Sequence, residues 1–203
     1  MNEDLLCSIT GQQADFEDSC RNFQVDERAE AEMADSVPLI GTELYSSLNT
    51  QKIGLLRSEQ NFSMGIAGSI FVGLVGAGLW AAITVVTGWK IGYMALAIGT
   101  GVGITMQFLG KGIDQKFGIV GAIIAVLSCV LGNFFSIMGY ISNQEGISYI
   151  DTLMYFDYSY TFDLLVETAH LMDLLFYSLA GFGGYKLAFR RLNQLEVAEL
   201  GKR

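Results

Sequence analysis

Long runs of apolar residues alternate with short polar segments along this chain. The intervals 60–89, 91–110 and 117–141 contain no charged residue. About 20 helical residues, each rising about 1.5 Å, are enough to cross a hydrocarbon core of roughly 30 Å. We therefore expect three membrane-spanning helices, at about 62–86, 91–110 and 117–141.

A fourth span is expected at about 169–189, with a less regular sequence. Counting back from Lys186 and Arg190 places Asp173 inside this segment, and Gly181, Gly183 and Gly184 loosen its second half. A carboxylate is costly in lipid, so we expect this helix to lie behind the others or to extend its polar end to the interface.

Small residues repeat at helical spacing within the first three blocks. They occupy one face of the third block, and the second block contains a GxxxG pair. Such a face lets two helix backbones approach closely, which predicts an all-α polytopic protein with four helices in a glycine-rich antiparallel bundle. An alternative is that some glycines line a pathway. The residues predicted to pack helices are Gly99, Gly103, Gly121, Ser128 and Gly132.

Polar segments flank the bundle, which we place at 61–191. Residues 1–36 predict a largely disordered acidic tail, and 37–60 a weakly amphipathic juxtamembrane segment. Residues 192–203 form the expected C-terminal tail. The tail cysteines, Cys7 and Cys20, have no neighbouring histidine, so a structural zinc site, which needs four ligands, is the weaker interpretation.

Composition supports a membrane protein and disfavours nucleic-acid binding. Apolar residues make up 51% of the 203 residues, with 24 glycines and one proline. Residues 1–50 hold eleven of the carboxylates and only two basic residues, so the net charge of −9 belongs mainly to the tail. A chain of this charge cannot neutralise phosphates, and we expect membrane lipid, not nucleic acid, as a partner.

Basic residues predict the orientation. Nine Lys and Arg residues flank the spans on one side, and Lys90 alone lies on the other. Positive charges remain on the cytoplasmic side, so we expect a multi-pass protein of the cytoplasmic (inner) membrane with both termini in the cytoplasm.

The expected outer loop, 142–168, combines five carboxylates with six Tyr and Phe residues and lacks Lys and Arg. Aromatic residues at this density favour the boundary between water and lipid, which predicts an interfacial helix or hairpin. A docking surface for a partner, or a shallow cation site, is the alternative.

Glu167, His170 and Asp173 are spaced three residues apart. Glu-x-x-His is a spacing of paired metal ligands in di-iron bundles, but those need a second copy of the motif and further carboxylates. These residues are therefore weak metal candidates, and a hydrogen-bonded interfacial histidine is the simpler interpretation. No HExxH, GxSxG or P-loop motif occurs, so we expect no enzyme activity and no cofactor.

The order of parts resembles uncharacterised bacterial four-span inner-membrane proteins with a Cys-bearing cytosolic N-terminal tail. The segments with the likeness are Cys7–Gly11, Ser19–Phe23, 97–110 and 117–133. The resemblance implies fold and location without an activity. We expect a non-enzymatic accessory or scaffold protein that forms a homo-oligomer or binds a membrane protein; the alternative is a small ion or solute channel with an acidic outer mouth.

Overall fold

The computed structural model describes residues 48, 50–89, 92–169 and 171–192. The chain divides into two units, Met1–Val37 and Pro38–Arg203, and every described residue belongs to the second. Within the described ranges the structure is helical and has no strand, which confirms the predicted all-α class. The predicted tail 1–36 and, apart from Leu192, the segment 192–203 lie outside the described residues.

Three helices are long and apolar enough to cross a membrane: α4 (Phe62–Thr87), α5 (Tyr93–Gly110) and α6 (Gln115–Glu145). They have 26, 18 and 31 residues, so even the shortest is about 27 Å long. Helix α6 extends four residues beyond the expected end of the third span. Ser142, Asn143 and Gln144 are polar, yet they continue the helix after the apolar block has ended.

The fourth region is bent. Helix α8 (Thr161–Thr168) is followed by α9 (Leu171–Leu187), and the segment Tyr158–Thr168 makes an angle of 103° with α9. Ala169, with an extended backbone, ends α8. The described chain therefore has three candidate spans, or up to four if the bent pair counts as one.

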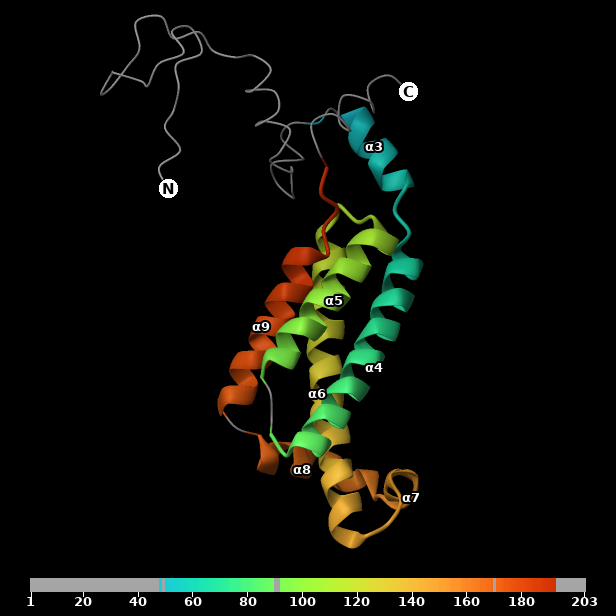
Figure 1. The fold of residues 1–203 in the computed structure, drawn as a ribbon. Helices are drawn as coiled ribbons and strands as arrows, with labels where there is room; N and C mark the ends of the chain where they lie inside the picture. Colours follow the sequence, from blue (N-terminus) through green and yellow to red (C-terminus); the bar gives the residue numbers. More distant parts are fainter. Residues whose placement is uncertain (1–47, 49, 90–91, 170, 193–203) are drawn as a thin grey trace, which may run out of the picture. The chain divides into compact units, whose positions relative to one another are not determined.

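The four long helices lie side by side, as Figure 1 shows. Helix α4 packs against α5 and α6, α9 packs against the same two helices, and α5 also contacts α6. The links between α4, α5 and α6 are short, so consecutive helices run in opposite directions. Helices α4 and α9 consequently lie on opposite sides of the α5–α6 pair.

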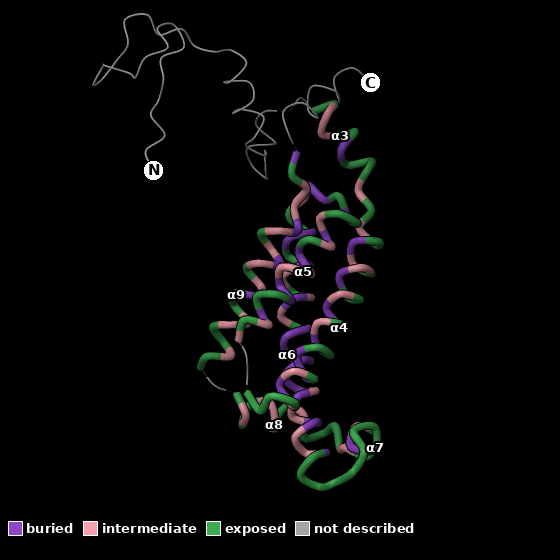
Figure 2. Tube along the Cα trace, viewed as in Figure 1, coloured by how far each residue is buried: buried purple, intermediate pink, exposed green. Residues whose placement is uncertain are grey.

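In Figure 2 the buried positions lie mainly where α4, α5 and α6 face one another. Many large apolar side chains are exposed. A core cluster that includes Trp80, Val102 and Cys129 lies between the helices. Phe71 and Phe108, in contrast, are 68% and 70% exposed. A soluble protein rarely leaves so many large apolar residues uncovered, whereas acyl chains solvate them readily.

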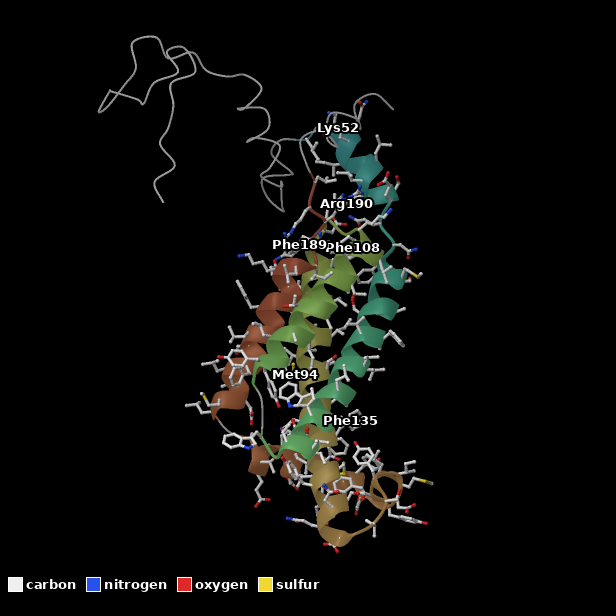
Figure 3. All side chains as sticks on the ribbon, in the orientation of Figure 1. Lys52, Met94, Phe108, Phe135, Phe189 and Arg190 are labelled. Carbon is white, nitrogen blue, oxygen red and sulfur yellow. The ribbon has the colours of Figure 1, made fainter. Side chains whose placement is uncertain are left out.

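One end of the bundle collects the basic residues, and we call it the basic end. Helix α3 (Thr50–Ser58), the link after α5 and the last turn of α9 lie there; Figure 3 shows Lys52 and Arg190 at this end. Helix α3 occupies part of the predicted juxtamembrane segment. Its Leu56 is fully buried and clusters with Leu48, Ile113 and Leu192.

The opposite end, which we call the acidic end, contains short helices. After α6 come α7 (Tyr149–Tyr155), the 3₁₀ turn η1 (Tyr158–Tyr160) and α8. Gly146, with a φ of 66°, ends α6 in a left-handed conformation that turns the chain toward α7. The predicted outer loop is thus a series of short helices in the structure.

Candidate functional site

The five predicted packing residues all lie where one helix meets another. Gly99 and Gly103 of α5 face α9. A Cβ on Gly99 would collide with the carbonyl of Ala180, and one on Gly103 would lie 3.0 Å from the carbonyl oxygen of Gly183. The two helices therefore touch through their backbones.

Helix α9 meets α6 in the same way. A Cβ on Gly121 would lie 2.8 Å from the carbonyl oxygen of Gly184, and one on Gly184 would lie 2.7 Å from that of Gly121. Ala125 also leaves no room for a side chain at Gly184, because a Cβ built there would lie 2.9 Å from the Cβ of Ala125. Helix α9 thus fits into the angle between α5 and α6 only because these positions lack side chains.

Ser128 and Gly132 of α6 face α4 on the other side of the bundle. Ser128 lies against Gly73, and a Cβ on Gly132 would be 3.4 Å from the Cα of Ala77. Further along, a Cβ on Gly65 of α4 would be 2.9 Å from the Cα of Gly110.

Buried hydroxyl groups in these interfaces donate to backbone carbonyls. Ser128 donates to Ile124 (2.8 Å) and Ser136 to Gly132 (2.7 Å), both within α6. Ser69 of α4 donates across the interface to Val102 of α5 (3.2 Å). Each of these hydroxyls thus has a main-chain carbonyl as its hydrogen-bond acceptor, a common arrangement for serine within helices.

The predicted metal candidates lie on two different helices. Glu167 is exposed near the end of α8, Asp173 is half-buried in the first turn of α9, and His170 lies outside the described residues. The continuous helix that the three-residue spacing assumed is interrupted at Ala169. Among the described side chains, no group of three His, Cys, Asp or Glu residues could hold a metal ion.

A polar contact connects α6 with α9 near the acidic end. Asn133, which is 4% exposed, lies within hydrogen-bonding reach of the Tyr177 hydroxyl, and the carboxylate of Asp173 acts electrostatically on the same phenol. Sequence reasoning identified Asp173 but missed Tyr177. Its position four residues after Asp173, on the same helical face, was the available signal.

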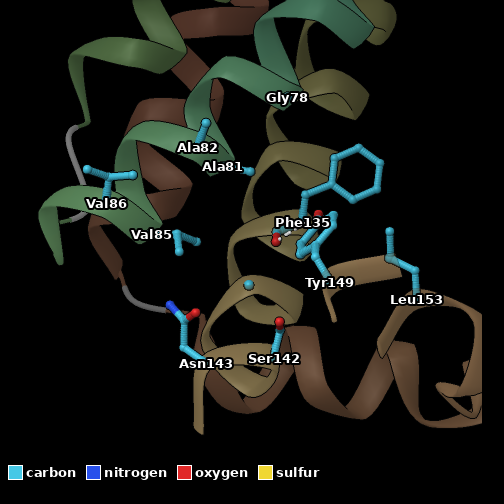
Figure 4. Close-up of a pocket in the computed structure, with 11 residues that line it drawn as sticks. Gly78, Ala81, Ala82, Val85, Val86, Phe135, Ser142, Asn143, Tyr149 and Leu153 are labelled. Atoms are coloured by element: carbon cyan, nitrogen blue, oxygen red, sulfur yellow. Dashed lines mark hydrogen bonds between the residues drawn. The ribbon is translucent and has the colours of Figure 1, made fainter. Parts of the chain in front are cut away.

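An apolar groove opens between α4, α6 and α7, with a volume of about 470 Å³ (Figure 4). Gly78 lies at one end, and Ser142 and Asn143 lie at the other, beside Val85 and Val86. The residues that line it are Gly78, Ala81, Ala82, Val85, Val86, Phe135, Gly139, Ser142, Asn143, Tyr149 and Leu153. Sequence reasoning did not predict this groove.

Helix α7 is held over α6 by polar contacts. The Tyr149 hydroxyl donates to the carbonyl of Phe135 (3.3 Å), and Ser142 donates to that of Ile147 (2.8 Å). Partial burial raises the pKa of Tyr149 above its ordinary value. The third wall of the groove is therefore fixed by side-chain bonds to main-chain carbonyls.

Asp157 organises the turn after α7. Its carboxylate accepts hydrogen bonds from the Ser159 hydroxyl (2.7 Å) and the Ser159 amide (3.0 Å). Both bonds favour the charged form, so they lower the pKa of Asp157. This is a capping role at the start of η1.

The basic end is held by ion pairs between distant segments. Arg57 of α3 bonds to Asp114 (3.0 Å), which also pairs with Lys116 (3.7 Å). Arg190 bonds to Glu59 (2.8 Å). These contacts connect α3, the α5–α6 link and the end of α9.

Comparisons with protein-family models, curated proteins and solved structures found no match for this chain. The resemblance to four-span bacterial inner-membrane proteins therefore stays a prediction.

Proposed function

We propose that this chain is a four-span protein of the cytoplasmic membrane and acts by binding, as an accessory or scaffold subunit. The observation that supports this most is the fit of α9 between α5 and α6. The backbone of α9 contacts the backbones of its two neighbours at Gly99, Gly121 and Gly184. A closely packed centre suits a rigid framework better than a water-filled path.

The same contacts support α9 as the fourth span. Its 17 residues extend about 26 Å, close to the hydrocarbon thickness, and its buried face meets two helices that can themselves cross a bilayer. Packing stabilises a helix of this kind most when the helix lies alongside its neighbours within the lipid.

The distribution of charge supports an orientation with both termini in the cytoplasm. Every Lys and Arg of the described residues belongs to the basic end. Cationic segments are retained on the cytoplasmic side, so the basic end would face the cytoplasm and the acidic end the exterior. The residues concerned are Lys52, Arg57, Lys111, Lys116, Lys186, Arg190 and Arg191.

Partner contact is proposed at the acidic end, where aromatic side chains are exposed. Tyr158 and Phe162 are 57% and 75% exposed, and aromatic residues of this kind are enriched in interfaces. The partner would be another membrane protein or a second copy of this chain.

Photocrosslinking in native membranes tests this role. A photoreactive residue at Phe162 should give one dominant protein adduct, whereas the same residue at the buried Phe134 should give none. If Phe162 yields only lipid adducts, the scaffold proposal is wrong.

A second candidate function, conduction of a small ion or solute, is favoured by the contact between Asn133, Tyr177 and Asp173. These polar groups lie between α6 and α9 near the acidic end. On this proposal, Asp173→Asn reduces flux in proteoliposomes while the elution volume of the purified protein stays the same. Wild-type protein without flux, or an unchanged flux in the variant, would exclude conduction.

A further inference from the structure

We propose that the groove between α4, α6 and α7 binds one acyl chain of a phospholipid whose headgroup is zwitterionic and contains an amine. This inference rests on the proposed position of the bundle in a membrane and adds a ligand to it. The groove volume, about 470 Å³, falls within the range of roughly 300–1,000 Å³ that small-molecule pockets occupy.

The length of the groove favours an acyl chain over a partner helix. Along α4 it runs from Gly78 to Val86, eight residues or about 12 Å. The hydrocarbon core is about 30 Å thick, so one leaflet provides about 15 Å. A spanning helix would require a groove through both leaflets, whereas a chain from one leaflet fills this one.

The shape of the groove depends on small residues along α4. Gly78 has open space where a side chain would be, with no atom within 4 Å of a Cβ built there. Ala81 and Ala82 continue this surface, with Phe135 of α6 and Leu153 of α7 among the other lining residues. The result is an apolar groove with small residues along its α4 wall.

The position of the polar rim places the headgroup. Ser142 and Asn143 lie at the end of the groove beside Val85 and Val86 (Figure 4). The hydroxyls of Ser142 and Tyr149 already donate to carbonyls, so Asn143 provides the side-chain amide at this rim. An ester or phosphate oxygen of a lipid is a suitable acceptor for an amide N–H.

Charge selects the class of headgroup. Residues 142–168 contain five carboxylates and no Lys or Arg, and Lys90 is the single basic residue that the sequence places on this side. An anionic headgroup would be repelled from this end, whereas an ammonium group would be attracted to it. The five are Glu145, Asp151, Asp157, Asp163 and Glu167.

Native mass spectrometry of the full chain, released from bilayers with equal amounts of phosphatidylethanolamine and phosphatidylglycerol, tests the proposal. We expect one retained phosphatidylethanolamine per chain. The double variant Gly78→Leu/Ala82→Leu fills the groove and should lose this lipid. The matched control Ala67→Leu adds the same side chain to an exposed position of α4 outside the groove and should keep it.

Three results would overturn the proposal. The groove-filling variant could retain the lipid while its elution and melting temperature match those of Ala67→Leu. Phosphatidylglycerol could be the lipid retained. Wild-type protein could be a dimer that the groove-filling variant alone dissociates, which would identify a second copy of the chain as the occupant.

Failure of this inference is distinguishable from failure of the proposed function. A chain that stays in the membrane fraction and gives a protein adduct at Phe162, but retains no lipid, refutes the lipid site alone. A chain that is monodisperse in buffer without detergent refutes both.

Discussion

The two ends of the bundle are stabilised in different ways. At the basic end, bonds join residues that are far apart in sequence: Arg57 to Asp114, and Arg190 to Glu59. At the acidic end, Ser142 bonds to Ile147, and Asp157 bonds to Ser159. The first pattern fixes distant segments to one another, while the second shapes a local segment. The segment after α6 is also attached to the bundle, through the Tyr149 hydroxyl on the carbonyl of Phe135 and the contact between the Phe156 and Phe134 rings.

Removing a large buried ring should show the widest difference between the ends. Phe117 is fully buried and packs edge-on against Phe62, with ring centroids 5.0 Å apart. We expect Phe117→Ala to cost roughly 3–5 kcal/mol, because it leaves a cavity. Phe156→Ala, at the acidic end, should cost about 1 kcal/mol, since that ring is half-buried and contacts Phe134 and Tyr158.

Thermal denaturation in detergent micelles measures both variants. Equal losses of stability would mean that the acidic end is as strongly coupled to the bundle as the basic end.

Neutralising a carboxylate should reduce stability less than removing a ring does. The loss should again be larger at the basic end than at the acidic end. Asp114 is 19% exposed and pairs with two cations, so Asp114→Asn should cost about 1 kcal/mol, and less in high salt. Asp151→Asn, in the exposed first turn of α7, should change stability by no more than about 0.5 kcal/mol. Denaturation at low and high salt compares them; a larger loss for Asp151 would reverse the comparison.

Tyr149 tests how firmly α7 is held over the groove. Tyr149→Phe removes the bond to the carbonyl of Phe135, a loss of about 0.5 kcal/mol, and should speed amide exchange in residues 149–155 alone. Because the pKa of this phenol is raised, the neutral form is favoured in the folded state, and the contact weakens as pH rises above the ordinary value of 10.0.

In an absorbance titration, Tyr149→Phe should show less late phenolate formation than the wild type, because one late-ionising tyrosine is removed. If amide exchange in Tyr149→Phe accelerates throughout α6 as well, the prediction is wrong, and α7 helps to stabilise the bundle.

The smallest expected effect concerns Asp157. Its pKa is lowered, so the turn with Ser159 is intact above the ordinary value of 3.8 and is lost as pH falls through the lower folded value. The amide resonance of Ser159 should shift in that range. Asp157→Asn should remove the shift, while Ser159→Ala, which keeps the backbone bond, should reduce it; an unchanged shift in Asp157→Asn would assign it to another group.

Helix positions could be predicted from charge, and helix partners could not. Lys90, Lys111 and Lys116 bound the apolar blocks closely, so α4, α5 and α6 begin and end within a few residues of the expected limits. The spacing of small residues identified Gly99 and Gly121 as packing positions, but it does not predict that both face α9. That assignment depends on contacts between segments some 60 to 80 residues apart.

The groove and the contact between α6 and α9 depend on tertiary contacts. The groove requires α7 to fold back over α6, and the contact of Tyr177 with Asn133 requires two helices in one register. The density of aromatic residues predicted an interfacial segment at 142–168. It does not specify how that segment folds. The break at Ala169 coincides with the expected boundary between the outer loop and the fourth span, but the bend there was not predicted.

The place of α9 between α5 and α6 has a consequence for biogenesis. Chains are made from the N-terminus, so α4, α5 and α6 are complete before α9 leaves the ribosome. Until then, the backbone around Gly99 and Gly121 lacks its final neighbour. The nascent protein thus passes through a stage with three helices, in which the surface between α5 and α6 is uncovered. Helix α9 covers this surface once it has been translated.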